Sequence, residues 1–184
     1  MTATELYHAE LERSDYEHHH PTAGAVIGHI TSNLLLHTLK IEQAKLFARG
    51  TAALFFAQKG NAWEDTEFAF IRKLNRELLA EGDLIPTTSK EVLEFGRLEE
   101  DGSRKYEDGN EQLFDLVKDF DTQLLYIGKG LALAKQEGHL GQVAALTDLA
   151  NWMKGEIAFA QNFLGHDLKE GLYVEEDDDD DDED

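Results

Sequence analysis

Four long stretches of this 184-residue chain repeat apolar residues at the spacing of an α-helix. Within each stretch the apolar side chains recur every three or four residues, which places them on one helical face. The clearest of these stripes consists of Leu113, Leu116, Val117, Phe120, Leu124, Ile127 and Leu131. The other stretches begin after Pro21, near Ala52 and near Leu140, and a glycine follows each of the four. Four helices of similar length predict an all-α protein with a four-helix bundle.

The connection between the second and third helices is nearly thirty residues long, from Gly82 to Gly109. Neighbouring helices of a bundle need only about 2 to 8 connecting residues. We therefore expect this segment to cross from one end of the bundle to the other. Within it, Thr88 and Glu91 have the spacing of a capping box and precede several apolar residues. This pattern predicts a short helix in the middle of the crossover.

The chain is strongly acidic, with 17 Lys and Arg against 38 Asp and Glu and a net charge of −21. Ten of the negative charges come from residues 175–184, which are all acidic. This balance disfavours direct binding to nucleic-acid phosphates or to an anionic membrane. The absence of cysteine excludes disulfides, thiolate metal sites and cysteine nucleophiles. No export signal and no membrane-spanning apolar run is present, so we expect a soluble, cytoplasmic protein.

The composition divides the chain into three parts. Residues 1–20 form an N-terminal extension, in which residues 2–13 have the pattern of a short helix with Leu6 and Leu11 as its only large aliphatic anchors. Residues 21–168 hold the bundle. Residues 169–184 form an acidic tail that we expect to be disordered, because it repels itself and has almost nothing to bury.

The strongest local metal signal lies at the end of the N-terminal extension. It consists of Asp15, Glu17, His18, His19 and His20. Carboxylates and imidazoles of this kind are ligands for zinc or iron. The alternative is a polar helix entry whose histidines lie in water, since adjacent residues do not share a helix face. His37, on the apolar stripe of the first long helix, is more typical of a hydrogen-bonded core or interface histidine than of a ligand.

Several segments resemble one protein family. Lys40-Ile41-Glu42-Gln43-Ala44, continuing to Arg49-Gly50, resembles the first-helix ending K-I-H-Q-x-H-W-x-x-R-G of the Dps family, the twelve-subunit mini-ferritins of bacteria. Residues 78–82 and 157–165 resemble the ends of its second and last helices. The acidic tail and the segment SDYEHHHPTAGA resemble divergent members from lactic acid bacteria. The resemblance implies a ferritin-like four-helix bundle with a short helix in the long crossover between helices two and three.

The resemblance also implies a ferroxidase centre shared between two subunits, with two histidines from one and an Asp-x-x-x-Glu pair from the next. In this chain the histidine positions fall on Lys45 and Ala57, and a nearby acid position falls on Asn61. The Asp-x-x-x-Glu pair falls on Arg72 and Arg76. Protonated lysine and arginine have no lone pair to offer a metal. We therefore assign no catalytic residue and expect no ferroxidase chemistry at this place, which leaves enzymatic activity elsewhere open.

Three cations at a partly enclosed subunit interface require carboxylates nearby. Glu42, Asp65 and Glu77 are the candidates for a salt-bridge network that replaces the metal. The alternative is that these cationic side chains reach solvent. The acidic iron-guiding positions of the family's threefold pore fall on Lys135, Leu140 and Ala144, with Asp148 one turn further along. The usual electrostatic route for iron entry is therefore not expected.

The residues and the resemblance together predict a dodecameric, Dps-like cage for iron sequestration and for DNA and stress protection, without the inter-subunit ferroxidase ligands. The alternative is a non-catalytic structural or DNA-associated shell. A third possibility is a new site for iron or another divalent cation at His18 to His20. Residues 1–20 contain five acids and one arginine, so DNA binding needs bridging cations or histidine protonation near pH 6. Whether the acidic tail faces the inside or the outside of the cage stays open.

Overall fold

The computed structural model describes residues 1–172, apart from the side chain of His18, and the acidic run 175–184 lies outside the described residues. Within them the chain forms six α-helices, one short 3-10 helix and no strand. The elements are α1 (Ala3–His19), α2 (Ala23–Phe47), α3 (Thr51–Glu81), α4 (Ser89–Phe95), η1 (Gly102–Tyr106), α5 (Gly109–Glu137) and α6 (Leu140–Leu164). The four long segments with helical periodicity are therefore helices, and the all-α, ferritin-like bundle is confirmed.

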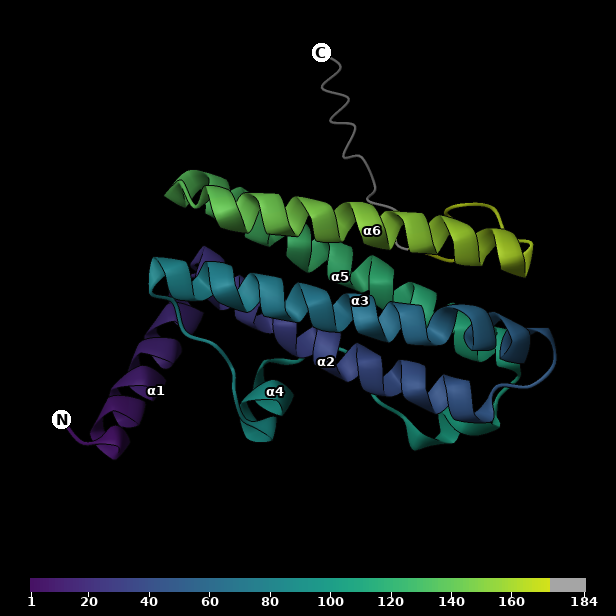
Figure 1. Cartoon of the computed structure of the whole chain (residues 1–184), viewed down its shortest axis with the longest axis horizontal. Coiled ribbons are helices and arrows are strands. Elements are labelled where there is room, and N and C mark those ends of the chain that lie inside the picture. Colours follow the sequence, from purple (N-terminus) through teal and green to yellow (C-terminus); the bar gives the residue numbers. More distant parts are fainter. Residues whose placement is uncertain (173–184) are drawn as a thin grey trace, which may run out of the picture.

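The four long helices α2, α3, α5 and α6 lie side by side and form the bundle (Figure 1). They contain 25, 31, 29 and 25 residues, so they are about 38 to 46 Å long at about 1.5 Å per residue. Their apolar stripes meet in one continuous core. At its centre the ring of Trp63 on α3 packs edge-on against Phe120 on α5, with ring centroids 5.0 Å apart.

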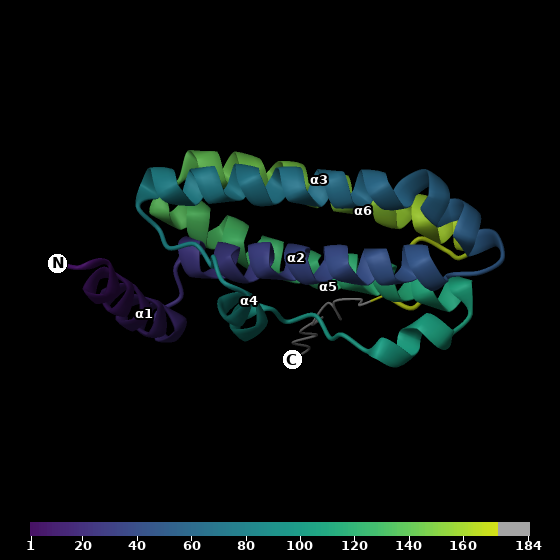
Figure 2. The same ribbon diagram turned by 60° about the horizontal axis from the view of Figure 1, so that its bottom comes forward.

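The crossover runs along the bundle from the end of α3 to the start of α5 and carries α4 and η1 (Figures 1 and 2). The predicted capping box is present at the start of α4. Glu91 N–H donates to Thr88 Oγ1 over 3.3 Å, and Thr88 N–H donates to Glu91 Oε2 over 2.8 Å. These two bonds satisfy donors that the first turn of a helix leaves free, and they fix the helix that the sequence predicted.

The N-terminal helix α1 is longer than the sequence indicated. It begins at Ala3 behind a second capping box, made by Thr2 and Glu5, and continues through the histidine segment to His19. Figure 2 shows it projecting from one end of the bundle. Leu6 and Leu11, the expected apolar anchors, are 56% and 41% exposed. Their apolar side chains are therefore only partly buried.

Polar contacts attach α1 to the rest of the chain. The hydroxyl of Tyr7 donates to Glu91 Oε1 on α4 over 2.8 Å. Arg13 donates to the carbonyl oxygen of Gly82 over 2.9 Å and forms an ion pair with Asp83. Both contacts reach the crossover rather than the four long helices.

After α6 the chain turns back against the bundle as far as Leu172, which is buried in the core. The buried amide of Gln161 donates to the carbonyl oxygen of Glu170 over 3.0 Å. Of the expected tail, Leu172 is thus packed on the bundle, whereas residues 169–171 are exposed. No helix in the described part of the chain has both the length and the apolarity to cross a membrane.

Candidate functional site at Lys45

Lys45, in the last turn of α2, occupies the first of the two positions where the resemblance places histidines. Its Nζ lies 2.6 Å from Glu42 Oε2 on the same helix and 2.7 Å from Glu64 Oε2 on α3. The stem of Lys45 passes over Gly60, where an added Cβ would lie 2.7 Å from Lys45 Cγ. A glycine in the middle of α3 therefore gives the lysine the room to reach Glu64.

The charges of this cluster do not balance. One ammonium group faces two carboxylates, which leaves one negative charge uncompensated. The hydrogen bond from Lys45 lowers the pKa of Glu42, whereas burial raises the pKa of Glu64. Burial acts to lower the pKa of Lys45, but its hydrogen bonds to both carboxylates outweigh this and raise it. Lys45 thus keeps its proton and is unable to bind a metal ion.

The other positions at which the resemblance places ferroxidase ligands are all on the surface of α3. Ala57, Asn61, Arg72 and Arg76 are exposed. Within residues 1–172, neither arginine forms an ion pair. They are four residues apart and therefore lie on the same face of the helix. A divalent metal does not fit this set of residues, which contains cations where the Dps family has ligands.

One of the three expected carboxylate partners, Glu42, lies beside Lys45 in the same chain. Glu42 contacts Lys45 as anticipated, and Glu64 is a partner that the sequence did not reveal. Asp65 is exposed on α3, and neither it nor Glu77 pairs with Lys45. The available signal was the spacing from Gly60, because Glu64 lies one helical turn further along the face that the glycine leaves open.

The four pore positions also lie at the surface. Lys135 and Ala144 are exposed, and Leu140, the first residue of α6, is 78% exposed. Asp148 is held by Lys73, with 2.6 Å between its Oδ2 and Lys73 Nζ. Among these four positions, the described chain thus carries one carboxylate, Asp148, and it is ion-paired.

The histidine segment forms the last turn of α1, not the entry of α2. His19 Nδ1 lies 2.9 Å from the carbonyl oxygen of Asp15, and His20 Nδ1 lies 3.1 Å from that of Tyr16. Glu17 accepts from Arg13 Nε over 2.6 Å. These side chains contact their own helix, and in the part of the chain that is described no three His, Asp or Glu residues are arranged to hold a metal ion.

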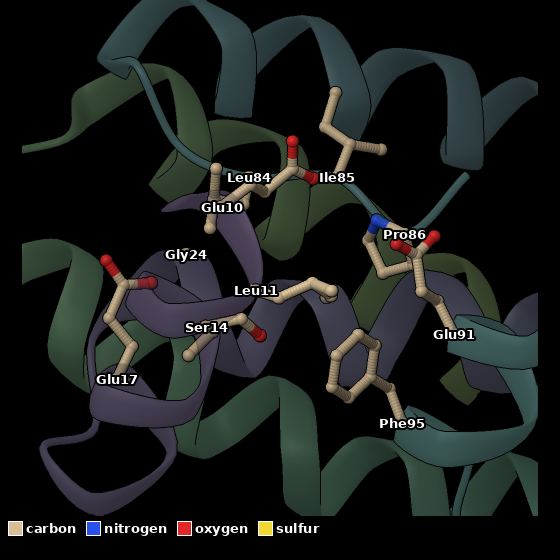
Figure 3. A pocket seen from close by; sticks show the side chains of 12 residues that line it. Glu10, Leu11, Ser14, Glu17, Gly24, Leu84, Ile85, Pro86, Glu91 and Phe95 are labelled. Atoms are coloured by element: carbon tan, nitrogen blue, oxygen red, sulfur yellow. The ribbon is translucent and has the colours of Figure 1, made fainter. Parts of the chain in front are cut away.

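A small cavity lies between α1 and the crossover (Figure 3). Leu11, Ile85 and Phe95 form apolar walls, and Glu10 and Glu17 stand at its edge. Its volume of about 40 Å³ gives room for about one water molecule. It separates α1 from the bundle but holds no set of groups suited to a larger ligand.

The antiparallel bundle and its crossover helix define the structural class of the chain as a ferritin-like mini-ferritin fold. No protein-family model matches the sequence, and no curated protein matches it. Solved structures do match. DpsA of Lactococcus lactis MG1363 is 28% identical with a TM-score of 0.86, over 92% of this chain and 99% of that chain. DpsB of the same organism is 27% identical with a TM-score of 0.83, over 89% and 94%.

Dps of Listeria innocua, in a structure soaked with cobalt, is 23% identical with a TM-score of 0.77, over 82% of this chain and 96% of that chain. At this identity the likeness concerns the fold alone. Together with the two lactococcal proteins, it confirms the resemblance that the sequence predicted. The chain is therefore similar to Dps proteins in fold and, at 27 to 28% identity to the lactococcal pair, in sequence.

Proposed function

We propose that the chain forms a cytoplasmic, homo-oligomeric Dps-like cage of twelve subunits that sequesters iron and protects DNA under stress. In this cage, ion pairs between subunits take the place of the shared ferroxidase centre. The observation that carries the proposal is the Lys45 cluster, in which a protonated lysine is bound by Glu42 and Glu64.

The charge of the cluster supports a contact with a second copy of the chain. Glu42 and Glu64 carry one more negative charge than Lys45 neutralises, and the side chain of Glu42 is 47% exposed. Arg72 and Arg76 are exposed on one face of α3. In the arrangement that the Dps family implies, this face of one subunit meets the histidine positions of the next. Two arginines from the neighbour then complete the cluster with opposite charge.

The same residues bear on whether the cage oxidises Fe(II) or only retains iron. Iron is the cargo, and the Lys45 cluster offers it no site. We expect purified protein to oxidise Fe(II), with oxygen or with hydrogen peroxide, no faster than buffer alone, while iron elutes together with the cage in size-exclusion chromatography. A saturable acceleration of Fe(II) oxidation would contradict the loss of the ferroxidase centre and direct attention to another site.

The replaced ligands also favour the second candidate, a non-catalytic structural or DNA-associated shell. The two candidates differ in iron retention, because a pure shell elutes without iron in the same experiment. The third candidate, a cation site at His18 to His20, predicts an acceleration that disappears when the three histidines are replaced by alanine. Each of the three outcomes is therefore recognisable from one set of measurements.

DNA protection requires a contact that does not depend on clustered lysine or arginine. Residues 1–20 carry five acids and one arginine, so direct phosphate binding by this extension is unfavourable. We propose that divalent cations bridge the acidic surface and the phosphates. Retention of the protein on immobilised DNA at neutral pH is expected to need Mg²⁺ and to be lost with a chelator. Retention that the chelator leaves unchanged would contradict bridging.

A further inference from the structure

A histidine and a glutamate face each other in the centre of the bundle. His37 on α2 and Glu67 on α3 are both fully buried, and His37 Nδ1 lies 2.5 Å from Glu67 Oε1. The ring of Phe120 on α5 packs against the imidazole with ring centroids 4.5 Å apart, and Trp152 of α6 packs edge-on against Phe120. His37 is thus the hydrogen-bonded core histidine expected from its place on the apolar stripe, and Glu67 is a partner that the sequence did not reveal.

Both ring nitrogens of His37 face acceptor atoms. Nδ1 faces the Glu67 carboxyl group, and Nε2 lies 3.2 Å from the main-chain carbonyl oxygen of Leu116 on α5. A neutral imidazole carries a proton on only one nitrogen. With Glu67 ionised, one lone pair of the ring would then face a lone pair of oxygen. A single additional proton, on the ring or on the carboxyl group, satisfies both contacts.

The surroundings favour retention of this proton. The charged groups that act on the pair are Lys40 on α2, Glu64 on α3 and Asp119 on α5. Burial disfavours the charged ring, but the charge and hydrogen bond of Glu67 and the charge of Asp119 outweigh it and raise the pKa of His37. Burial raises the pKa of Glu67 and of Asp119. Lys40, which is ion-paired with Asp119, opposes the charge on His37.

We propose that the proton shared by His37 and Glu67 acts as a pH-sensitive switch that stabilises the packing of α2 against α3 and α5. The pair holds the proton at neutral and mildly acidic pH and loses it at alkaline pH. Its loss leaves either the contact with Glu67 or the contact with Leu116 repulsive, so the centre of the bundle loosens.

Buried polar atoms without hydrogen-bond partners indicate where water enters the bundle after the proton is lost. Glu67 Oε2 is buried without a hydrogen-bond partner within the described residues. Gln123, one turn beyond Asp119 on α5, is fully buried, and neither atom of its amide has a partner there. Buried polar atoms of this kind bind water as soon as it reaches them.

The direction of the pH dependence follows from the raised pKa values. A group whose pKa is higher in the folded state stabilises the fold fully below its ordinary pKa. For His37 that ordinary value is 6.5. The stabilisation then decreases as the pH rises through the folded-state pKa. Glu67 and Asp119 act in the same direction, so the bundle is tightest in mildly acidic solution.

The substitution Glu67→Gln tests the proposal with little change of shape. A glutamine amide donates to Nδ1 of a neutral imidazole whose Nε2–H donates to Leu116, so no additional proton is needed. The urea midpoint of the wild type is expected to fall between about pH 6 and pH 9, and the midpoint of the variant to stay level. Asp148→Asn, on an exposed ion pair, serves as the control and keeps the fall. Parallel curves for wild type and Glu67→Gln would overturn the proposal.

Hydrogen exchange of the wild type tests the same proposal without a variant. After correction for the intrinsic rate, amide protection in residues 30–41 of α2 is expected to fall by about tenfold or more between about pH 6.5 and pH 8.5. Residues 143–157 of α6, whose Trp152 packs on Phe120, provide the internal comparison and lose less. Unchanged protection in residues 30–41 over this range would overturn the proposal even if Glu67→Gln fails to fold.

Discussion

One glycine determines whether the side chain of Lys45 reaches its partner Glu64. Gly60 lies in the interior of α3, where a glycine costs about 1 kcal/mol relative to alanine. The stem of Lys45 fills the space that a side chain at position 60 would need, and its ammonium group meets Glu64 one turn further along. Gly60, Lys45 and Glu64 therefore act as one set, and a change at any of them affects the other two.

This interdependence predicts opposite effects for two glycine-to-alanine substitutions. Gly60→Ala is expected to lower the free energy of unfolding by about 1 to 2 kcal/mol, because the displaced lysine leaves Glu64 without its counter-ion. Gly155→Ala, in α6 with no atom within 4 Å of the added Cβ, is expected to raise it by about 0.5 to 1 kcal/mol. Urea denaturation measures both. Equal stabilisation by the two substitutions would show that Lys45 does not need the space.

Sequence reasoning located the unusual residues but, of their partners, only Glu42. Lys45, Arg72 and Arg76 stand out because the resemblance places metal ligands there. Glu64 and Glu67 were missed, since one-dimensional spacing does not show which residue of α3 lies opposite a given residue of α2. A signal existed for Glu67, which falls on the apolar stripe of α3 between Trp63 and Ile71. An acid on such a stripe requires a buried partner.

At the scale of elements, α1 differs from the bundle helices in how it is held. The bundle helices share one apolar core, whereas α1 exposes its leucines and depends on Tyr7 and Arg13 for its attachment to the crossover. Hydrogen bonds of this kind contribute about 0.5 to 1.5 kcal/mol each. The orientation of α1 is therefore controlled by a few polar side chains.

We expect the double substitution Tyr7→Phe with Arg13→Ala to release α1 without unfolding the bundle. Limited proteolysis is expected to cut between α1 and α2 faster than in the wild type, while the thermal midpoint of the bundle stays the same. Leu6→Ala, at a residue that is 56% exposed, is the control and leaves the cleavage rate unchanged. Equal protection of the double variant would mean that another contact holds α1.

The long helices and α4 were predictable because their signals are local. Apolar periodicity, the glycines that end the helices, and the Thr88–Glu91 capping box each act within a few residues. The length of α1 was not predicted, because its apolar residues are too sparse for a periodic stripe. The Thr2–Glu5 capping box was the signal for its start.

In the whole assembly, the proposed contact depends on attraction between opposite charges on two copies of the chain. Arg72→Glu with Arg76→Glu places acids opposite Glu42 and Glu64, so we expect the assembled fraction in sedimentation experiments to fall strongly. Wild-type assembly is expected to weaken in high salt, because the screening length shrinks from about 10 Å at 0.1 M to about 3 Å at 1 M. Lys90→Glu, an exposed charge reversal on α4, controls for net charge and leaves assembly intact.

An electron cryo-microscopy map of the assembled protein, prepared with added Fe(II), tests most directly which side chains meet between neighbouring subunits. We expect the guanidinium groups of a neighbour's Arg72 or Arg76 within about 4 Å of the carboxylates of Glu42 or Glu64, and no metal density between them. Arginines that point into solvent, or a metal ion bound beside Lys45, would contradict it.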